Sequence, residues 1–266
     1  MGFAEITGKD HISPSQIDMM LKCGQQYKFR YLEGIKSAPG FALIVGSGTH
    51  DGVEYDLTKK LNTGELATIE EISDAAADSV RERFKKEDVQ CKDGESAGVA
   101  VDQAVQLCGV HHSDLAPTLN PEALELELRI EVDGYPVGFL GYADIVEKGG
   151  VVRDIKTSAS KKQQKFIDTS LQITYYDWAY ETLMEAALAE LRFDVLVKTK
   201  KPYVQLMETT RDDSHRIKFL HYAESLIESV ERGVFHPAVP GDWLCSEKFC
   251  GYWSRCKYGA RQAVTK

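Results

Sequence analysis

Apolar residues recur at helical spacing through most of the first half of the chain. Ser13-Pro14-Ser15 precedes a run whose periodicity predicts an N-capped helix over residues 12–34, with Cys23 in its middle and Gly34 near its end. The pattern continues over residues 46–62, 69–88 and 98–112, with a glycine-containing break at Asp93-Gly94. We therefore expect a mostly helical first half.

The pattern changes to a period of two from Ala123 onward. Residues 123–132 alternate apolar and charged side chains. The segments 135–148 and 151–158 follow, after Asp133-Gly134 and Gly149-Gly150 respectively. This predicts a three-stranded antiparallel meander. Helical spacing returns over 165–190, residues 191–199 and 202–210 predict a second strand pair, and a last helix over 211–232 precedes the tail. No linker or repeat interrupts the chain, so we expect one α/β domain with a helical insertion.

The turn at Gly149-Gly150 folds Asp144 back toward Asp154. A two-residue turn places Asp144 opposite Ile155, and one more residue in the turn places it opposite Asp154. Carboxylates that close repel each other unless a cation joins them or one takes a proton. Oxygen ligands of this kind suit Mg²⁺ or Mn²⁺, and alternation puts Lys156 on the same face as Asp154. The ordinary alternative is a hairpin whose charged groups face water, but the apolar flanks favour burial.

Composition and charge bound the kind of protein. The chain has 266 residues, 43% of them hydrophobic, and a net charge of −9. No stretch approaches the ~20 apolar residues of a membrane span, and the first residues do not resemble a secretory signal, so we expect a cytoplasmic protein that does not enter a membrane. The negative charge argues against a nucleic-acid partner, yet residues 156–165 hold four lysines and no acid. We therefore expect a polarised surface with one basic groove.

The six cysteines are distributed unevenly along the chain. Cys245, Cys250 and Cys256 lie in a polar, glycine-containing tail, and Cys23 lies near the start. Such a tail is a poor place to bury three thiols without a bond to something. The remaining two, Cys91 and Cys108, are expected to be small buried hydrophobes.

Several motifs together resemble the PD-(D/E)XK nuclease superfamily. They are Gly-x-x-Asp ending at Asp144, the strand motif Asp154-Ile155-Lys156, the helix motif Gln172-x-x-x-Tyr176, and His50 after Gly-Ser-Gly-Thr. With that histidine and the Gln-x-x-x-Tyr helix, the chain resembles the RecB-like branch, which includes the CRISPR-associated RecB-like exonucleases and the AddB nuclease domain. The similarity runs from about residue 12 to residue 259.

The resemblance implies a fold for the whole chain. That fold is a restriction-endonuclease-like α/β core, with a central mixed β-sheet flanked by helices, in one domain over residues 1–266. Its parts would be the first helix (12–34), a helical region (46–113), the catalytic core (123–210), and a last helix with the Cys-rich segment (211–259).

The resemblance also assigns roles to residues. It makes His50, Asp144, Asp154 and the Ile155 carbonyl metal ligands and Lys156 the catalytic lysine, oriented by Gln172 and Tyr176. Taken singly, a histidine near a helix start is more often a cap, and a Gln/Tyr pair is more often ordinary surface. Glu125 and Glu127 resemble an acidic position of the family, and the sequence leaves open which one faces the site.

A cluster is implied for the four cysteines. Members of this branch hold a [4Fe-4S] cluster on one N-terminal and three C-terminal cysteines, here Cys23, Cys245, Cys250 and Cys256. Four thiolates suit an iron–sulfur cluster or tetrahedral Zn²⁺, and spacing alone does not decide between them. Such a clasp would tie the first helix to the tail and stabilise the fold.

The implied function is a DNA exonuclease dependent on Mg²⁺ or Mn²⁺. It would act on single-stranded DNA or DNA ends, with 5′ to 3′ polarity, in DNA repair, recombination or CRISPR-type DNA processing. Aromatic residues are candidates for stacking on bases: Tyr175, Trp178, Tyr252 and Trp253. One alternative is a nucleic-acid-binding, end-processing subunit of a helicase–nuclease or spacer-acquisition complex with little activity alone. Another is a zinc-stapled binding module without catalysis. Helicase partners, CRISPR-adaptation partners and a homo-oligomer stay open.

Overall fold

The computed structural model describes residues 1–259, which divide into two compact units. The first unit consists of residues 1–37, 129–141 and 211 onward, and the second of residues 38–128 and 142–210. Strands β2 (Pro121–Ile130) and β3 (Gly138–Glu147) contribute residues to both. The prediction of a single domain over 1–266 stays a prediction, and residues 260–266 of that range lie outside the described residues.

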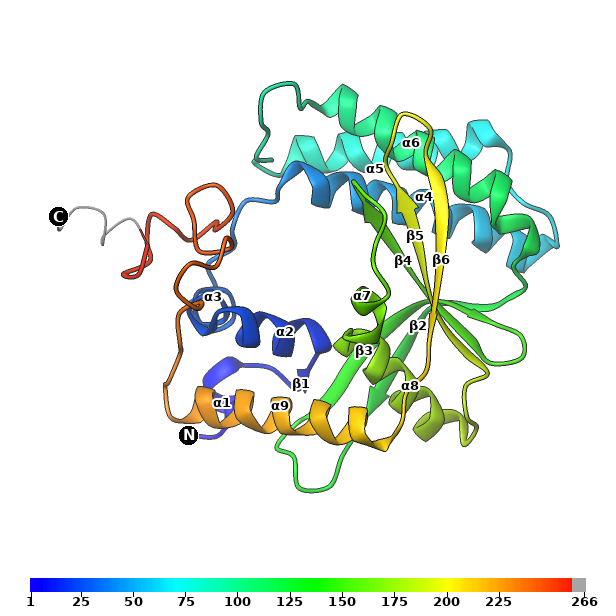
Figure 1. Cartoon of the computed structure of the whole chain (residues 1–266). Helices are drawn as coiled ribbons and strands as arrows, with labels where there is room; N and C mark the ends of the chain where they lie inside the picture. The colour runs from blue at the N-terminus through cyan, green and yellow to red at the C-terminus, as the bar shows by residue number, and fades with distance from the viewer. Residues whose placement is uncertain (260–266) are drawn as a thin grey trace. The chain divides into compact units, whose positions relative to one another are not determined.

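The second unit holds a mixed sheet with helices on both faces (Figure 1). In the sheet, β3 pairs antiparallel with β4 (Val151–Ser158), β4 parallel with β5 (Glu190–Val197), and β5 antiparallel with β6 (Tyr203–Thr209), while β2 also pairs with β3. The helices are α4 (Phe41–Thr63), α5 (Ile69–Lys86), α6 (Ala97–Asp114), α7 (Lys165–Asp168) and α8 (Leu171–Met184), with a 3₁₀ turn η2 (Ala116–Thr118). The expected α/β fold with a mixed central sheet and flanking helices is confirmed.

Helices α4, α5 and α6 pack closely because glycines line one side of α4. A Cβ atom added at Gly48 would lie 2.4 Å from a methyl of Val80 on α5, and one at Gly52 would lie 2.6 Å from the Cys108 sulfur on α6. The resulting core joins the three helices to one face of the sheet, which contributes Ile145, Ile155 and Leu196. On the other face, Phe166 of α7 packs against Phe193 of β5 at 5.4 Å between ring centroids.

The β3–β4 turn decides between the two expected registers. Glu147 pairs with Val151, so the turn has three residues, and Gly149 and Gly150 both take positive φ values of 92° and 80°. Only glycine adopts such angles without strain. The pairing continues to Ile145 opposite Arg153, which brings Asp144 and Asp154 next in line across the two strands.

The first unit is built around its own core. Its elements are α1 (Phe3–Thr7), β1 (His11–Ile12), α2 (Pro14–Lys22), α3 (Gly24–Tyr27), a π-helix η1 (Lys28–Leu32) and α9 (Asp213–Glu231). Strand β1 pairs parallel with the start of β3, His11 opposite Gly138. Phe139 and Phe219 pack at 5.8 Å between ring centroids, and Phe3 and Ile17 are fully buried.

Two sequence expectations about helices are corrected. The helix expected over 12–34 is interrupted at Cys23, whose φ of −165° and ψ of 103° are extended, so Cys23 lies between α2 and α3 rather than in mid-helix. Gly24 packs there so closely on the segment after α9 that an added Cβ would lie 2.9 Å from the His236 nitrogen. The second helix begins at Phe41, five residues before the expected 46.

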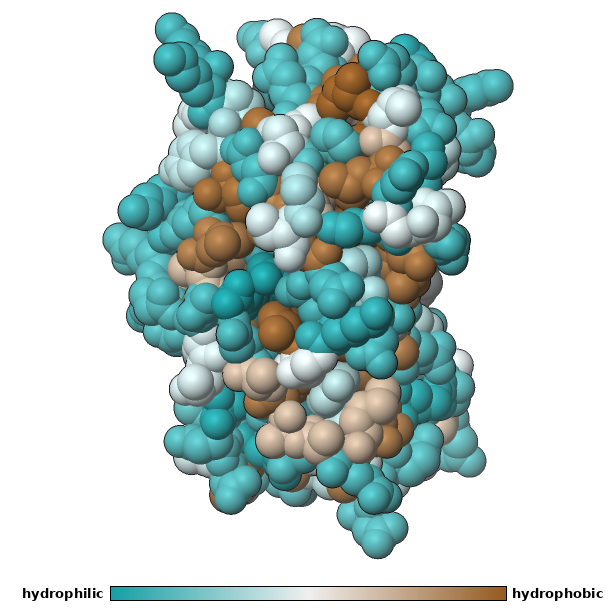
Figure 2. Space-filling view, turned by 90° about the vertical axis from the view of Figure 1, so that its right-hand side faces the viewer, coloured by the Kyte–Doolittle hydropathy of each residue, from teal (hydrophilic) through white to brown (hydrophobic). Residues whose placement is uncertain are grey.

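Two further expectations concern single cysteines and membrane spans. Cys108 is buried as expected, but Cys91 is exposed, so the expectation for Cys91 was wrong. Among residues 1–259, no helix combines the length and the apolar character needed to cross a bilayer. On the molecular face in Figure 2, hydrophobic residues are scattered among hydrophilic ones.

Candidate metal centre and catalytic network

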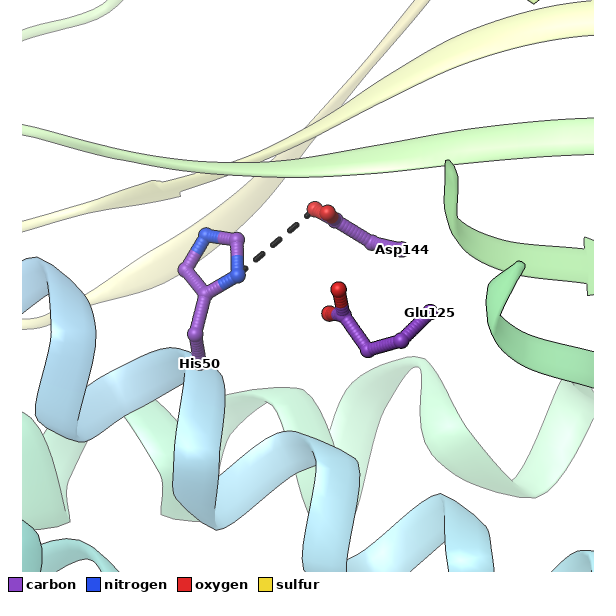
Figure 3. Close-up of side chains that lie close together, drawn as sticks. All are labelled: His50, Glu125 and Asp144. Carbon is purple, nitrogen blue, oxygen red and sulfur yellow. Dashed lines mark ion pairs between the residues drawn. The ribbon is translucent and has the colours of Figure 1, made fainter. Parts of the chain in front are cut away.

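Three side chains from three elements of the second unit converge on one point. His50 comes from α4, Glu125 from β2 and Asp144 from β3, and one potential ligand atom of each lies within 4.8 Å of the others (Figure 3). Helix α4 presents His50 to β4 with Gly46, one turn earlier, on the same side. A Cβ at Gly46 would lie 3.3 Å from the Thr157 hydroxyl, so the glycine lets the helix approach the strand.

The hydrogen bonding of His50 decides which of its ring nitrogens presents a lone pair to Glu125 and Asp144. Its Nε2 lies 2.8 Å from the Ile155 carbonyl oxygen. A carbonyl can only accept, so Nε2 carries the proton and Nδ1 carries a lone pair. Nδ1 faces an Asp144 carboxylate oxygen at 3.6 Å. Burial lowers the pKa of His50, which favours the neutral ring.

Three acceptor groups therefore face one another, and a backbone donor, the Ile155 N–H, contacts one of them, Asp144, at 2.6 Å. Burial, and next the negative charge of Asp154, raise the pKa of Asp144 well above its usual value. Only a proton or a cation relieves such a cluster. One imidazole nitrogen and two carboxylates are donors that divalent cations such as Mn²⁺ and Mg²⁺ accept. The residues present thus fit a divalent metal.

Glu125 reaches this point through an unusual backbone conformation. Its φ is 47°, in the left-handed region, although it lies within β2. Burial, followed by the charge of Glu54, raises the pKa of Glu125. Glu127, two residues on, instead accepts a hydrogen bond from the Tyr142 hydroxyl at 2.9 Å. Of the two acids that the sequence left open, the structure brings Glu125 to His50 and Asp144.

A second set of contacts runs from Asp154 through Lys156 to helix α8. Asp154 is fully buried, and one of its oxygens lies 2.5 Å from the Lys156 ammonium nitrogen. Lys156 also donates to the Gln172 amide oxygen at 2.9 Å, and the Gln172 amide nitrogen donates to the Tyr176 oxygen at 2.6 Å. The Tyr176 hydroxyl donates to the Tyr142 carbonyl and lies 3.4 Å from Asp154.

The same contacts determine the protonation states of Lys156 and Tyr176. Burial works against the Lys156 ammonium, but the carboxylates of Asp154 and Asp144 outweigh it, so the pKa of Lys156 is raised. Burial also raises the pKa of Tyr176 well above its usual value, with Asp154 adding to the effect. Lys156 therefore stays positive and Tyr176 stays a hydrogen-bond donor at neutral pH.

Comparison with known proteins identifies the family of this chain. The profile described as the PD-(D/E)XK nuclease superfamily matches residues 11–257. The chain therefore belongs to the PD-(D/E)XK nuclease superfamily. A solved structure of a "Putative exonuclease" from Eubacterium rectale has the same fold, with a TM-score of 0.61 and 15% identity over 90% of this chain and 89% of that one. A protein designated SSO0001 gives a TM-score of 0.39 and 17% identity over 91% and 94% of the chains. No curated protein matches.

PD-(D/E)XK nucleases use divalent metals, and the expected site residues lie close to such a site. His50 and Asp144 are two members of the converging trio, and the expected Asp154 lies beside it with its carboxylate on Lys156. The Ile155 carbonyl, expected as a ligand, accepts from His50. The motif of the superfamily thus covers two adjoining sets of contacts, one of acceptors and one centred on a lysine.

In the first unit, four cysteines line one pocket. They are Cys23, Cys245, Cys250 and Cys256, and aromatic residues such as Phe29 and Tyr252 complete the wall. None of the four forms a disulfide. Burial, and then the three neighbouring cysteines, raise the pKa of Cys245, while the Gln26 amide nitrogen lies 3.6 Å from the Cys250 sulfur. Four thiols gathered in this way become stable thiolates only around a cationic centre.

The aromatic residues expected to stack on bases are mostly buried. Tyr175 is 0% exposed, Trp178 8% and Tyr252 4%, so these three are core residues, the commoner role of such aromatics, and not candidates for stacking. Tyr175 donates to the Leu128 carbonyl at 2.8 Å, which fixes it inside the second unit. Trp253 is partly buried.

Proposed function

We propose that this chain is a divalent-metal-dependent deoxyribonuclease that hydrolyses phosphodiester bonds. The observation that carries the proposal is the meeting of His50 Nδ1, Glu125 and Asp144, three acceptors that share one backbone donor, beside a half-buried Lys156 that stays positive. A metal held there would act as a Lewis acid on the phosphodiester and on water. Membership of the PD-(D/E)XK nuclease superfamily supports this chemistry.

The residues of the site would have three roles: metal binding, stabilisation of charge, and positioning of the lysine. His50, Glu125 and Asp144 would hold the metal, and Asp154 would add a ligand from β4. The Ile155 carbonyl, expected as a ligand, would instead orient the His50 ring by accepting from its Nε2. Lys156 would place its ammonium against the negative charge that develops on the phosphate. Gln172 and Tyr176 would keep Lys156 aimed, because the amide of Gln172 contacts Lys156 at one end and the Tyr176 hydroxyl at the other.

The proposed substrate is DNA, as single strands or ends, cut as an exonuclease with 5′ to 3′ polarity. The motif resemblance to the RecB-like branch supports this assignment, as does the solved neighbour described as an exonuclease. The same resemblance supports a role in DNA repair, recombination or CRISPR-type processing.

We also propose that Cys23, Cys245, Cys250 and Cys256 hold a [4Fe-4S] cluster. The shared pocket supports a four-thiolate site, and the RecB-like resemblance favours iron over zinc. A brown protein that contains iron and sulfide would support the cluster, and a colourless protein that contains zinc would exclude it.

The nuclease proposal is tested with labelled single-stranded DNA and Mg²⁺ or Mn²⁺. We expect Lys156→Ala to slow cleavage by about 100-fold or more, because it removes the cation facing the reacting phosphate. Asp144→Asn should abolish cleavage, and so should a chelator. Lys148→Ala, at an exposed lysine of the β3–β4 turn, is the matched control and should cut like the wild type. Equal cleavage by Lys156→Ala and the wild type would refute the proposal.

A further inference from the structure

Six lysines gather where β4 and β5 end in the second unit. Three follow β4 and three follow β5; they are Lys161, Lys162, Lys165, Lys198, Lys200 and Lys201, here called the lysine patch. Strands β4 and β5 are parallel, with Ser158 beside Val197, so both carboxyl ends lie at one edge of the sheet.

Hydrogen bonds hold the two lysine-bearing turns against each other. The Lys198 backbone N–H donates to the Ser158 carbonyl at 2.7 Å. The Gln205 side chain on β6 accepts from the Lys162 N–H and donates to the Lys162 carbonyl, both at 2.8 Å. Two turns that lie more than thirty residues apart in the sequence therefore form the patch together.

The charges of the patch are not neutralised within the described part of the chain. None of the six lysines there lies within 4.0 Å of a carboxylate oxygen. Lys161, Lys165, Lys200 and Lys201 are exposed. The acid Glu95 acts on Lys198, whose pKa burial lowers. A chain with a net charge of −9 thus keeps an uncompensated cationic surface at one sheet edge.

The patch begins close to the proposed catalytic lysine. Ser158 is two residues beyond Lys156 on β4, or about 7 Å at the usual rise of a strand. We propose that the lysine patch binds the phosphodiester backbone of the nucleic-acid strand whose scissile phosphate lies at Lys156. This inference rests on the proposed nuclease function. Repeated phosphates along a strand need repeated cations, and the two turns present them next to the catalytic strand.

The binding test uses protein made inactive by Asp154→Ala and a fluorescent single-stranded oligonucleotide, followed by anisotropy over a series of salt concentrations. In that background, Lys200→Gln with Lys201→Gln should weaken binding roughly tenfold near physiological salt. The slope of log affinity against log salt should become less steep by about 1.4, because each lost phosphate contact changes the slope for single strands by about 0.7. The matched control replaces two exposed lysines elsewhere in the second unit, Lys85→Gln with Lys148→Gln, and should leave both quantities unchanged.

A second measurement separates the patch from the catalytic site. In otherwise wild-type protein, the Lys200/Lys201 variant should cleave bis(p-nitrophenyl) phosphate at the wild-type rate, because this small diester is too short to reach the patch. If that diester is cleaved but the patch and control variants bind DNA with equal affinity and slope, the patch inference is wrong while the nuclease stands. If neither diester nor DNA is cleaved, the nuclease proposal falls, and the salt slopes still decide whether the patch binds DNA.

Discussion

Glu125 combines a strained backbone with a carboxylate at the proposed metal site. Non-glycine residues rarely adopt its φ of 47°, which costs roughly 1 kcal/mol or more. Strain of this kind persists where the surrounding structure enforces it and is often found at functional sites. Here the conformation turns the side chain toward His50 and Asp144. The backbone strain at Glu125 therefore accompanies the placement of its carboxylate at the proposed metal site.

The strain makes Glu125 respond to glycine in an unusual way. We expect Glu125→Gly to be more stable than Glu125→Ala by about 1 kcal/mol, because alanine keeps the Cβ that disfavours the left-handed region. At Glu127, which has no positive φ, the order should reverse, with glycine less stable than alanine by about 0.5–1 kcal/mol. Urea unfolding of the four variants without metal measures both differences. The same order at both positions would contradict the assigned backbone conformation.

The residues of the site were largely predictable, while the strain was not. His50, Asp144, Asp154 and Lys156 stand out through motif spacing, and the structure places them within two adjoining sets of contacts. The choice of Glu125 over Glu127 was not predictable, because strict alternation puts both acids on one face of a strand. A left-handed residue in β2 breaks that alternation, and no pattern in the sequence marks it.

Among the elements, helix α6 carries a buried histidine in its last turn. His111 is 0% exposed, and neither of its ring nitrogens has a hydrogen-bond partner among the described residues. Burial, with a smaller effect from Arg153, lowers the pKa of His111 to about 3. The last turn of α6 thus buries a histidine that must stay neutral.

This histidine links the stability of the second unit to pH. The pKa of His111 is lower in the folded state than the ordinary value of about 6.5, so stability is full above that value and is lost as the pH falls toward 3. At pH 5 the loss should reach about 2 kcal/mol. In His111→Leu we expect this loss to vanish, with the stability at pH 7.5 unchanged or higher because an unpaired polar group is removed.

Thermal unfolding at pH 7.5 and pH 5 measures the difference between the wild type and His111→Leu. Groups that titrate in both proteins cancel in this comparison. The exposed His221 on α9 provides the matched control, and His221→Leu should keep the wild-type dependence. If His111→Leu loses as much stability on acidification as the wild type does, His111 is not the linked group.

The same contrast between local and distant causes explains which elements the sequence predicts. Alternation located β2, the turn residues between the following segments located β3 to β6, and helical spacing located α5 and α6 within two residues at each end. The break at Cys23 was missed because the helical period continues through it. At the break, Gly24 packs against His236 more than two hundred residues later. No local pattern reports such a contact.

At the scale of the whole molecule, the net charge of −9 hides opposite local charges. The acidic residues that meet at His50 are the ones a cation would neutralise, while the lysine patch lies on the turns that follow β4 and β5. A total charge averages over these features. The negative sum therefore gives no argument against a polyanionic substrate.

The four-cysteine pocket joins the two ends of the chain within the first unit. Cys23 and Cys245 are separated by 221 residues, and a cross-link between them restricts the unfolded chain strongly. For a closed loop of this length the entropic stabilisation is about 5 kcal/mol. Because all four cysteines belong to the first unit, the stabilisation by the proposed cluster should act on that unit.

The last prediction follows from this location. Calorimetry of the loaded protein should show the unfolding transition of the first unit shift to lower temperature in Cys245→Ser, because the closure between the N-terminal segment and the tail is lost. The second unit, whose core lies between α4–α6 and the sheet, should keep its transition. Cys91→Ser, which replaces an exposed cysteine outside the pocket, is the matched control and should leave both transitions in place. Equal shifts in the two serine variants, or a loss confined to the second unit, would show that the cysteines of the pocket do not clasp the chain.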